Sequence, residues 1–266
     1  MSNIDMKSTK RSLNARTRRA LSAEERAVYE WQLTVAGFGE AGQQSLKSAT
    51  VLISRVGGVG GVAATALAAA GVGRLILAHE GNVKPSDLNR QTLMTADWLG
   101  KPRVDSAARR LKAMNPRLAI ETVNENIGED NVDRLVSSAD LVIDAAPLFR
   151  ERFLLNRAIV EQGKPMVDSA MFELEMQLTT IVPGKTPCLT CIYPGDPPGW
   201  KRQFPVFGAV AATIGSLAAM EAIKVLSGLG EPLLGRLLLA DLRDMSFRTV
   251  QLKRNIHCLV CRDRNP

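Results

Sequence analysis

The chain has 266 residues, of which 45% are hydrophobic and 23% are charged. This composition is ordinary for a soluble globular protein and excludes a disordered or fibrous chain. The length allows one large domain or two small ones. The formal net charge is +7, from 34 basic and 27 acidic residues. Because the only histidines are His79 and His257, we do not expect the central chemistry to rest on histidine acid–base catalysis.

Most of the net charge lies at the beginning of the chain. Residues 1–20 contain six basic residues and one acid, which accounts for +5 of the +7. We expect residues 1–20 to form a solvated, disordered arm, with binding to nucleic acid or an acidic partner as the alternative. The arm has no apolar core, so we expect no secretory signal and a cytoplasmic location. Residues 21–266 are expected to form a single domain.

The first predicted elements are a helix and a glycine-containing βαβ unit. The helix covers residues 22–47 and begins with a capping box of Ser22 and Glu25. A strand over residues 50–53 and a helix over 62–70 follow it, and the strand that completes the unit includes Leu75, Ile76 and Leu77. Between the first strand and its helix stand four glycines: Gly57, Gly58, Gly60 and Gly61. This arrangement is typical of nucleotide binding, because the loop amides and the helix N-terminus can hold phosphate.

Helices and strands alternate beyond this unit and then give way to an antiparallel pattern. The alternating elements are a helix at 102–114, a strand at 118–123, a helix at 131–137, a strand at 141–144, a helix at 150–162 and a strand at 165–169. After residue 173 come a strand at 177–182, a loop at 194–205, a buried helix at 207–226 and strands at 236–241 and 247–252. The predicted fold class is therefore α/β, with a doubly wound, mostly parallel, Rossmann-like sheet and antiparallel C-terminal strands.

One uncharged run tests for a membrane segment. Residues 204–220 carry no charge, but Glu221 and Lys224 follow at once. The run is shorter than a spanning helix requires and is rich in alanine and glycine. We therefore predict a buried helix and no membrane association.

The four cysteines form two C-x-x-C pairs, Cys188 with Cys191 and Cys258 with Cys261. Each pair places two thiolates on one turn, and two such turns complete a tetrahedral Cys₄ site. The spacing predicts structural zinc, with a disulfide framework or a redox pair as alternatives. A closed Cys₄ shell leaves no open position for catalysis, so the predicted role of the metal is stabilisation.

An ordered set of motifs resembles a known family. The set comprises the glycine loop, Ala70-Gly71-Val72-Gly73, Leu88-Asn89-Arg90-Gln91, Lys101-Pro102-Arg103-Val104, Met114-Asn115-Pro116, Ile214-Gly215-Ser216 with Met220-Glu221-Ala222-Ile223-Lys224, and the two C-x-x-C pairs. Together these motifs are similar to the ubiquitin-activating-enzyme superfamily, in its bacterial ThiF/MoeB/HesA branch. The resemblance covers residues 22–263.

The resemblance implies carboxylate activation. Members of this branch use ATP and magnesium to adenylate the C-terminal glycine of a small ubiquitin-fold sulfur carrier or a peptide, and release pyrophosphate. The implied partners are that carrier or peptide and a second copy of the chain in a homodimer, with a heterodimer with an active homologue as the alternative. A membrane partner is not expected, and a nucleic-acid partner is not favoured.

The resemblance also implies a set of site residues. The nucleotide-binding positions are Gly57, Gly58, Gly60, Glu80, Asn89, Arg90, Arg103 and Asp144. Arg90 and Arg103 are the expected catalytic cations, because the negatively charged carboxylate and α-phosphate must approach each other. Arg103 stands where the family has lysine, and the two side chains are not equivalent at phosphate sites.

Four positions depart from the family pattern. His79 replaces the ribose-binding aspartate, which Glu80 would replace if the strand ended one residue later. Pro147 replaces a magnesium-binding aspartate. Glu80 and Asp144 are the remaining candidates for holding magnesium. Trp31 stands where an arginine from the dimer partner reaches the triphosphate, and Arg55 replaces the first loop glycine.

These departures keep three interpretations open. The chain is either a divergent adenylyltransferase, a binding or heterodimer partner that has lost catalysis, or a protein for a different nucleotide or substrate. The chain has no cysteine between Cys191 and Cys258, so a thioester-forming cysteine in that region is excluded.

Overall fold

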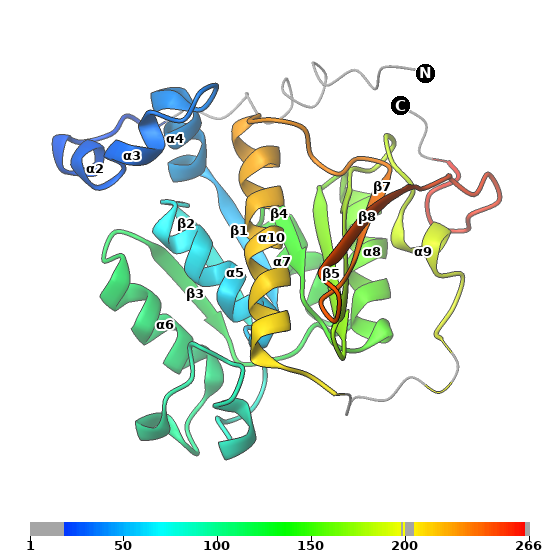
Figure 1. Ribbon diagram of the computed structural model, residues 1–266, viewed down its shortest axis with the longest axis horizontal. Helices are drawn as coiled ribbons and strands as arrows, with labels where there is room; N and C mark the ends of the chain where they lie inside the picture. The colour runs from blue at the N-terminus through cyan, green and yellow to red at the C-terminus, as the bar shows by residue number, and fades with distance from the viewer. Residues whose placement is uncertain (1–18, 198, 200–204, 264–266) are drawn as a thin grey trace.

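The computed structural model describes residues 19–197, 199 and 205–263. Within these residues, one eight-stranded sheet runs through the molecule in the order β3-β2-β1-β4-β5-β6-β7-β8 (Figure 1). The strands are β1 (Thr50–Ser54), β2 (Arg74–Ala78), β3 (Ala119–Val123), β4 (Leu141–Asp144), β5 (Met166–Phe172), β6 (Glu175–Ile181), β7 (Arg236–Asp241) and β8 (Ser246–Gln251). Strands β1 to β5 pair in parallel, and β5 to β8 pair antiparallel. The predicted fold class is confirmed.

The helices cover both faces of the sheet. They are α2 (Ala23–Val28), α3 (Glu30–Leu33), α4 (Gly39–Ser48), α5 (Gly58–Ala69), α6 (Arg103–Met114), α7 (Val132–Ser137), α8 (Phe149–Gln162), α9 (Leu189–Ile192) and α10 (Gly208–Ser227), with short 3₁₀ turns η1 (Pro85–Asp87) and η2 (Ala96–Trp98). Helices α4, α5, α6 and α10 share one hydrophobic cluster with the sheet, and α7, α8 and α9 share the other.

The N-terminal helical region differs from its prediction. The capping box of Ser22 and Glu25 is present, with backbone-to-side-chain hydrogen bonds of 2.7 and 3.2 Å. The single helix predicted over residues 22–47 is wrong, because the region is divided into α2, α3 and α4. Gly37 and Gly39 have φ values of +79° and +55°, which a continuous α-helix does not allow. The predicted basic arm, residues 1–20, lies outside the described residues except for its last two.

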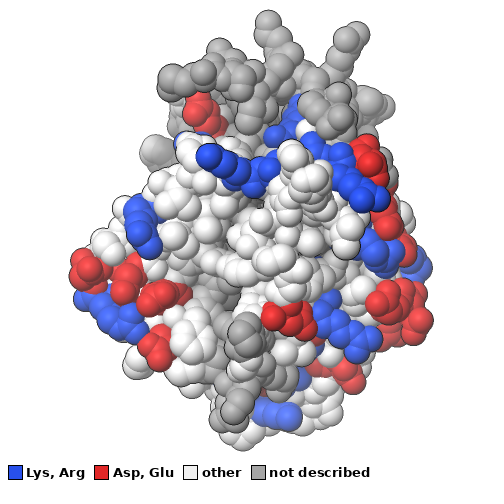
Figure 2. All heavy atoms as spheres, turned by 90° about the vertical axis from the view of Figure 1, so that its right-hand side faces the viewer, with Lys and Arg blue, Asp and Glu red and all other residues white. Residues whose placement is uncertain are grey.

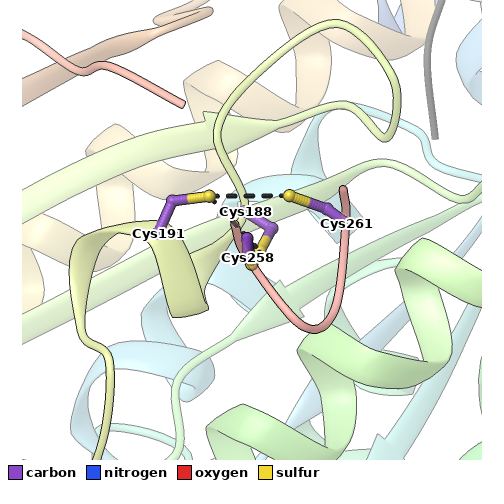
Figure 3. Close-up of side chains that lie close together, drawn as sticks. All are labelled: Cys188, Cys191, Cys258 and Cys261. Atoms are coloured by element: carbon purple, nitrogen blue, oxygen red, sulfur yellow. Dashed lines mark hydrogen bonds between the residues drawn. The ribbon is translucent and has the colours of Figure 1, made fainter. Parts of the chain in front are cut away.

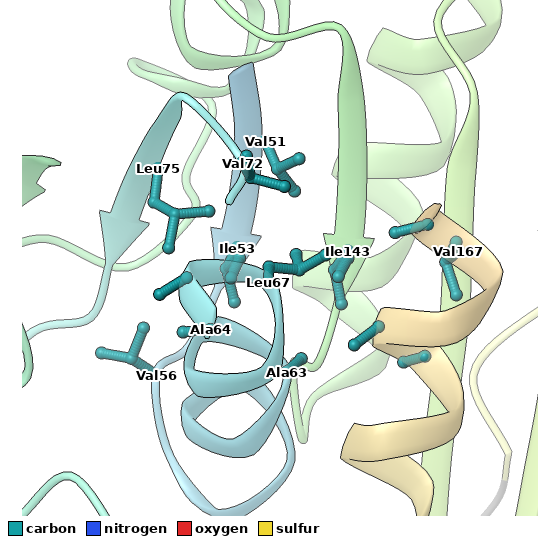
Figure 4. Close-up of a cluster of buried hydrophobic side chains, with 14 of the residues drawn as sticks. Val51, Ile53, Val56, Ala63, Ala64, Leu67, Val72, Leu75, Ile143 and Val167 are labelled. Atoms are coloured by element: carbon teal, nitrogen blue, oxygen red, sulfur yellow. The ribbon is translucent and has the colours of Figure 1, made fainter. Parts of the chain in front are cut away.

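Alternating side chains on the parallel strands fill the two layers of the core. Val51 and Ile53 of β1 pack toward α5 and α10 (Figure 4). Leu52, between them, belongs to the other cluster, together with residues of α8. All three are fully buried. A strand covered on both faces needs apolar residues at every position, so these strands appear in the sequence as continuous apolar runs.

Helix α10 is a core helix. Among the described residues it is the one helix whose length and apolar composition would suit a membrane span, yet more than half of its apolar window is buried. It packs along α5 and against β5 and β6. Gly215 makes the close approach possible, because a Cβ there would lie 2.5 Å from the carbonyl oxygen of Val59 and 2.9 Å from the Val62 Cβ.

The order of the strands creates a crevice at one end of the sheet. Ser54, at the end of β1, lies in register with Asp144, at the end of β4. The chain leaves β1 toward β2 and leaves β4 toward β5, on opposite sides of this pair. In open α/β sheets, ligands bind at the carboxyl ends of the strands where the order reverses in this way.

Gly215→Ala tests the packing of α10 on α5. Alanine gains about 0.5–1 kcal/mol of helix propensity over glycine, but its methyl group collides with the backbone of α5. We expect a net loss of about 1–3 kcal/mol in the free energy of unfolding, measured by urea denaturation. Ser216→Ala, at the exposed neighbouring position, is the control and should change stability by less than about 0.5 kcal/mol. An unchanged Gly215→Ala midpoint would contradict the packing account.

Candidate functional site

A cleft of about 1020 Å³ occupies the crevice between β1 and β4 and extends over β5 to β8. The glycine loop, the first turn of α8 and the open face of the antiparallel strands line it. Figure 2 looks at the molecule from the side of β8 and α9, and shows a recess in a largely uncharged centre. Lys and Arg side chains gather across the upper part of the same face. The cleft is therefore large enough for a nucleotide together with part of a second substrate.

The glycine loop, which the sequence predicts to bind a nucleotide, lies at the wall of the cleft. Gly57 and Gly58 line it at the beginning of α5, where backbone amides have no partner within the helix. A Cβ on Gly58 would lie 3.0 Å from the Ala211 Cβ. Gly60 does not line the cleft. A Cβ there would lie 2.3 Å from the carbonyl oxygen of Arg55, so this glycine is required by the turn itself.

Arg90 lines the cleft beside the glycine loop, where a Cβ on Gly58 would lie 3.6 Å from the Arg90 Cγ. Its guanidinium donates to the Ser86 carbonyl and to Oδ1 of Asn89 at 3.0 Å, and lies 3.8 Å from Oδ1 of Asp87. Asn89 is exposed and does not line the cleft. In this conformation Asn89 orients Arg90, and Arg90 is the member of the predicted pair that faces the cleft.

Arg103 and Glu80 lie outside the cleft lining. The Arg103 guanidinium is buried and donates to Oδ2 of Asp87 at 2.8 and 3.0 Å and to the Glu80 carbonyl at 3.0 Å. The Glu80 side chain is exposed and accepts a 2.8 Å hydrogen bond from Asn126. Both predicted ligands are thus engaged by other residues, and Asp87 is the acid that organises this side of the site.

Asp144 belongs to a buried ionic cluster beneath the cleft. Its Oδ1 accepts from the Ser54 hydroxyl at 3.2 Å and from the Ala146 amide at 2.9 Å. Arg152 of α8 donates to Oδ1 of Asp168 at 2.6 Å, and its Nε lies 3.5 Å from Oδ2 of Asp144. Burial raises the pKa of Asp144 to about 7; Arg152 lowers it and the Asp168 carboxylate raises it. Of the three charged groups, Arg152 is the one that reaches the cleft.

Three of the four departures from the family pattern line the cleft. Arg55, His79 and Pro147 are cleft residues, and Arg55 and His79 are buried. Trp31 is 83% exposed on α3 and is not part of the lining. The differences at Arg55, His79 and Pro147 therefore change the surface that a nucleotide would meet.

The four cysteines converge at one point, as predicted (Figure 3). The sulfur–sulfur distances are 3.9 Å for Cys188–Cys191, 3.6 Å for Cys188–Cys258 and 3.5 Å for Cys191–Cys261. Four thiolates at about 2.3 Å from a zinc ion would lie about 3.8 Å apart, so the cluster fits this metal. Helix α9 and its N-cap, Cys188, supply one pair, and the C-terminal loop supplies the other. A zinc ion held there would fasten that loop to the core beside α8.

The structure also shows residues that the sequence analysis missed: Asp87, Glu151, Arg152 and Asp168. Asp168 offered a usable signal, because it follows the buried Val167 just as Asp144 follows Ile143 at the end of a neighbouring strand. The other three are charged residues on turns or helices, where a solvent-exposed position is the ordinary expectation.

Removal of the metal should loosen the C-terminal loop. We expect about one zinc ion per chain after mild purification, and loss of this zinc in Cys258→Ser. Thermal unfolding of Cys258→Ser, or of wild type with a chelator, should shift downward by at least about 5 °C, since 1 kcal/mol shifts the midpoint of a domain of this size by about 2–4 °C. His257→Ala, at an exposed neighbouring residue, is the matched control and should retain zinc. Much less than one zinc per wild-type chain would contradict the assignment.

The raised pKa of Asp144 predicts a pH-dependent stability. In the native state the Asp144 carboxyl keeps its proton up to about pH 7, whereas in the unfolded chain, with an ordinary pKa of 3.8, it releases the proton earlier. The protonated carboxyl therefore contributes to stability fully below about pH 4, and this contribution is lost as the pH rises through about 7. The free energy of unfolding should therefore fall between about pH 5 and pH 8 by at least about 1 kcal/mol more in wild type than in Asp144→Asn, whose Oδ1 still accepts hydrogen bonds. Urea denaturation at several pH values measures the difference. Asp130→Asn, an exposed control, should follow wild type, and equal slopes for all three proteins would refute the prediction.

Comparisons with known proteins agree with this architecture. The protein HesA (heterocyst) of Trichormus variabilis is 51% identical over 92% of this chain and 92% of its own length. A sulfur carrier protein adenylyltransferase of Thermus thermophilus is 37% identical over 90% of this chain and 92% of its own length. The crystal structure of E. coli MccB with MccA-N7isoASN superposes with a TM-score of 0.80 at 23% identity, covering 91% of this chain and 75% of that one, which concerns the fold alone.

A family model also matches most of the chain. The ThiF family matches residues 29–260, which include the glycine loop, Arg90, the buried aspartates and most of the Cys₄ cluster. The chain therefore belongs to the ThiF family of ubiquitin-activating-enzyme-like adenylyltransferases.

Proposed function

We propose that this protein uses ATP to adenylate the C-terminal carboxylate of a small ubiquitin-fold sulfur carrier protein or a peptide. The observation that carries the proposal is the single cleft that joins the glycine loop and Arg90 to an open antiparallel sheet face. Family membership supports the reaction class, and the relative from Thermus thermophilus bears the name of that activity.

In the proposed step, a carboxylate oxygen attacks the α-phosphorus of ATP. The bond from this phosphorus to the bridging oxygen of the β-phosphate breaks, pyrophosphate leaves with the electron pair, and an acyl-adenylate remains. Both reactants are anions, so the step requires cations that are already in place. Arg90 and Arg152 both line the cleft and supply such charge.

The antiparallel strands offer a place for the substrate's extended tail. Ala170, Gln177, Leu239 and Arg248 lie in one cross-strand row over β5 to β8, and all four line the cleft. The row leads away from the glycine loop across a face that no described helix covers. An extended C-terminal segment laid on it would bring its terminal carboxylate toward the phosphates.

The residues that line the cleft do not fit a dedicated magnesium site beside the glycine loop. Pro147 offers no ligand, and neither Glu80 nor Asp144 lines the cleft. The acids that line it within the described residues are Glu175 and Asp241, which are cross-strand neighbours on β6 and β7, away from the glycine loop. No step is therefore assigned to a protein-bound magnesium ion.

This disagreement favours a second candidate function. A chain that keeps the cleft and the fold but lacks a magnesium ligand would serve as a binding or heterodimer partner of an active adenylyltransferase. The expected homodimer and the expected cytoplasmic location remain part of the proposal.

ATP–pyrophosphate exchange tests the proposal. Purified protein should exchange labelled pyrophosphate into ATP when a sulfur carrier ending in Gly-Gly, or a candidate peptide, is present. Arg90→Ala should reduce the exchange rate by about 10²–10³-fold, because one well-placed electrostatic group contributes this much. Arg134→Ala, on the exposed side of α7, is the control and should exchange like wild type.

The outcomes separate the two candidates. Absence of exchange together with absence of ATP binding in calorimetry would rule out the enzyme. The partner function would be favoured if the protein binds ATP without exchange and also increases the exchange rate of an added active homologue.

A further inference from the structure

Arg55 has an unusual backbone conformation. It follows β1 directly and has a φ of +66°, in the left-handed region that favours glycine. A residue with a Cβ is disfavoured there by about 1–2 kcal/mol of conformational free energy. Arg55 still donates its amide to the Ala78 carbonyl at 2.7 Å, so the conformation is part of the regular turn. Strain of this kind persists where the surrounding structure enforces it, and it often accompanies a functional site.

Glu151 holds the Arg55 side chain in place. The Arg55 Nε donates to Oε2 of Glu151 at 2.8 Å, and Nη2 donates to Oε1. The two side chains are 8% and 7% exposed, so the pair is screened little by water. It joins the turn after β1 to the first turn of α8, on opposite sides of the crevice. A guanidinium bound at two nitrogens by one carboxylate has a fixed orientation.

The third nitrogen of the guanidinium remains available. Within the described residues, Nη1 of Arg55 has no hydrogen-bond partner, while the side chain lines the cleft together with Gly57 and Gly58. The amides of this loop lie at the beginning of α5, where phosphate binding is favoured. The oriented guanidinium thus offers an N–H edge beside the loop that is predicted to hold the nucleotide's phosphates.

We propose that Arg55 is an additional phosphate ligand of the cleft and that Glu151 is its positioning residue. The phosphate accepts hydrogen bonds from Nη1, while Glu151 keeps Nε and Nη2. The proposal rests on the proposed nucleotide site, but it does not require that adenylation takes place there. If Arg55 only stabilised the turn, its replacement would lower the stability of the fold. The loss of affinity would then not depend on the number of phosphates on the ligand.

Calorimetric titration with three probes tests this role. Wild type and a double variant, Arg55→Gly with Glu151→Gln, are titrated with ATP, adenosine and inorganic tripolyphosphate. Glycine suits the φ of +66°, and glutamine avoids leaving a buried unpaired carboxylate. The double variant should bind ATP and tripolyphosphate about 10- to 100-fold more weakly, the worth of one charge-assisted hydrogen bond, and should bind adenosine as wild type does.

Two further variants guard the interpretation. Lys47→Met with Glu25→Gln removes a different ion pair, 2.6 Å long and near the amino end of β1, and should leave all three affinities unchanged. If the double variant does not fold, Arg55→Lys replaces it. Lysine keeps the charge beside Glu151 but loses the guanidinium fork, so the same phosphate-specific loss is expected, at about 3- to 10-fold.

Equal affinities for ATP in wild type and the folded variants would overturn the proposal, as would equal losses for ATP and adenosine. Wild type that binds neither ATP nor tripolyphosphate would overturn it as well. Wild type that binds both through Arg55 and catalyses no pyrophosphate exchange would support Arg55 as a phosphate ligand and refute only the proposed adenylation.

Discussion

The parallel pairing of β1 with β4 is the constraint on which the site depends. It places Ser54 beside Asp144, two residues that are 90 positions apart in the sequence. Because the chain leaves these strands toward opposite edges of the sheet, their following loops diverge and leave a crevice. The glycine loop comes from β1 and the first turn of α8 comes after β4, so the two walls of the cleft exist only when this pairing has formed.

Two neighbouring residues of α8 form the buried ion pairs that join this helix to the strands beside the crevice. Glu151 binds Arg55 at the end of β1, and Arg152 binds Asp168 of β5 and approaches Asp144 of β4. Buried charges are tolerated because each has a partner, and the partners hold the two arginines in fixed orientations. Cations oriented in advance need no reorganisation when a phosphate arrives, which is the condition for electrostatic catalysis. Complete burial raises the pKa of Asp144, and the neighbouring Asp168 carboxylate adds to this rise, while Arg152 opposes it.

The sequence predicted the local features of this protein well. The buried strands were visible as apolar runs, and the two C-x-x-C pairs predicted the cluster that the structure forms. The family followed from an ordered set of motifs and is confirmed. The predicted helix over 22–47 was wrong because periodicity alone did not register the turn at Gly37 and Gly39. Helix α5 begins at Gly58, earlier than the predicted residue 62. Glycines are poor helix formers, so the sequence pattern did not indicate a helix there, but close packing requires them in its first turn.

The sequence by itself determined the types of element, the cysteine cluster and the family, because each of these follows from spacing over a short stretch or from the order of motifs. Only the tertiary structure decided which charges meet. Arg103 binds Asp87, 16 positions away in the sequence, and Arg55 binds Glu151, 96 positions away. Such pairs depend on strand order, register and the direction of each side chain, none of which local patterns specify. The glycine loop therefore identified the kind of site, and the fold determined which side chains face the ligand.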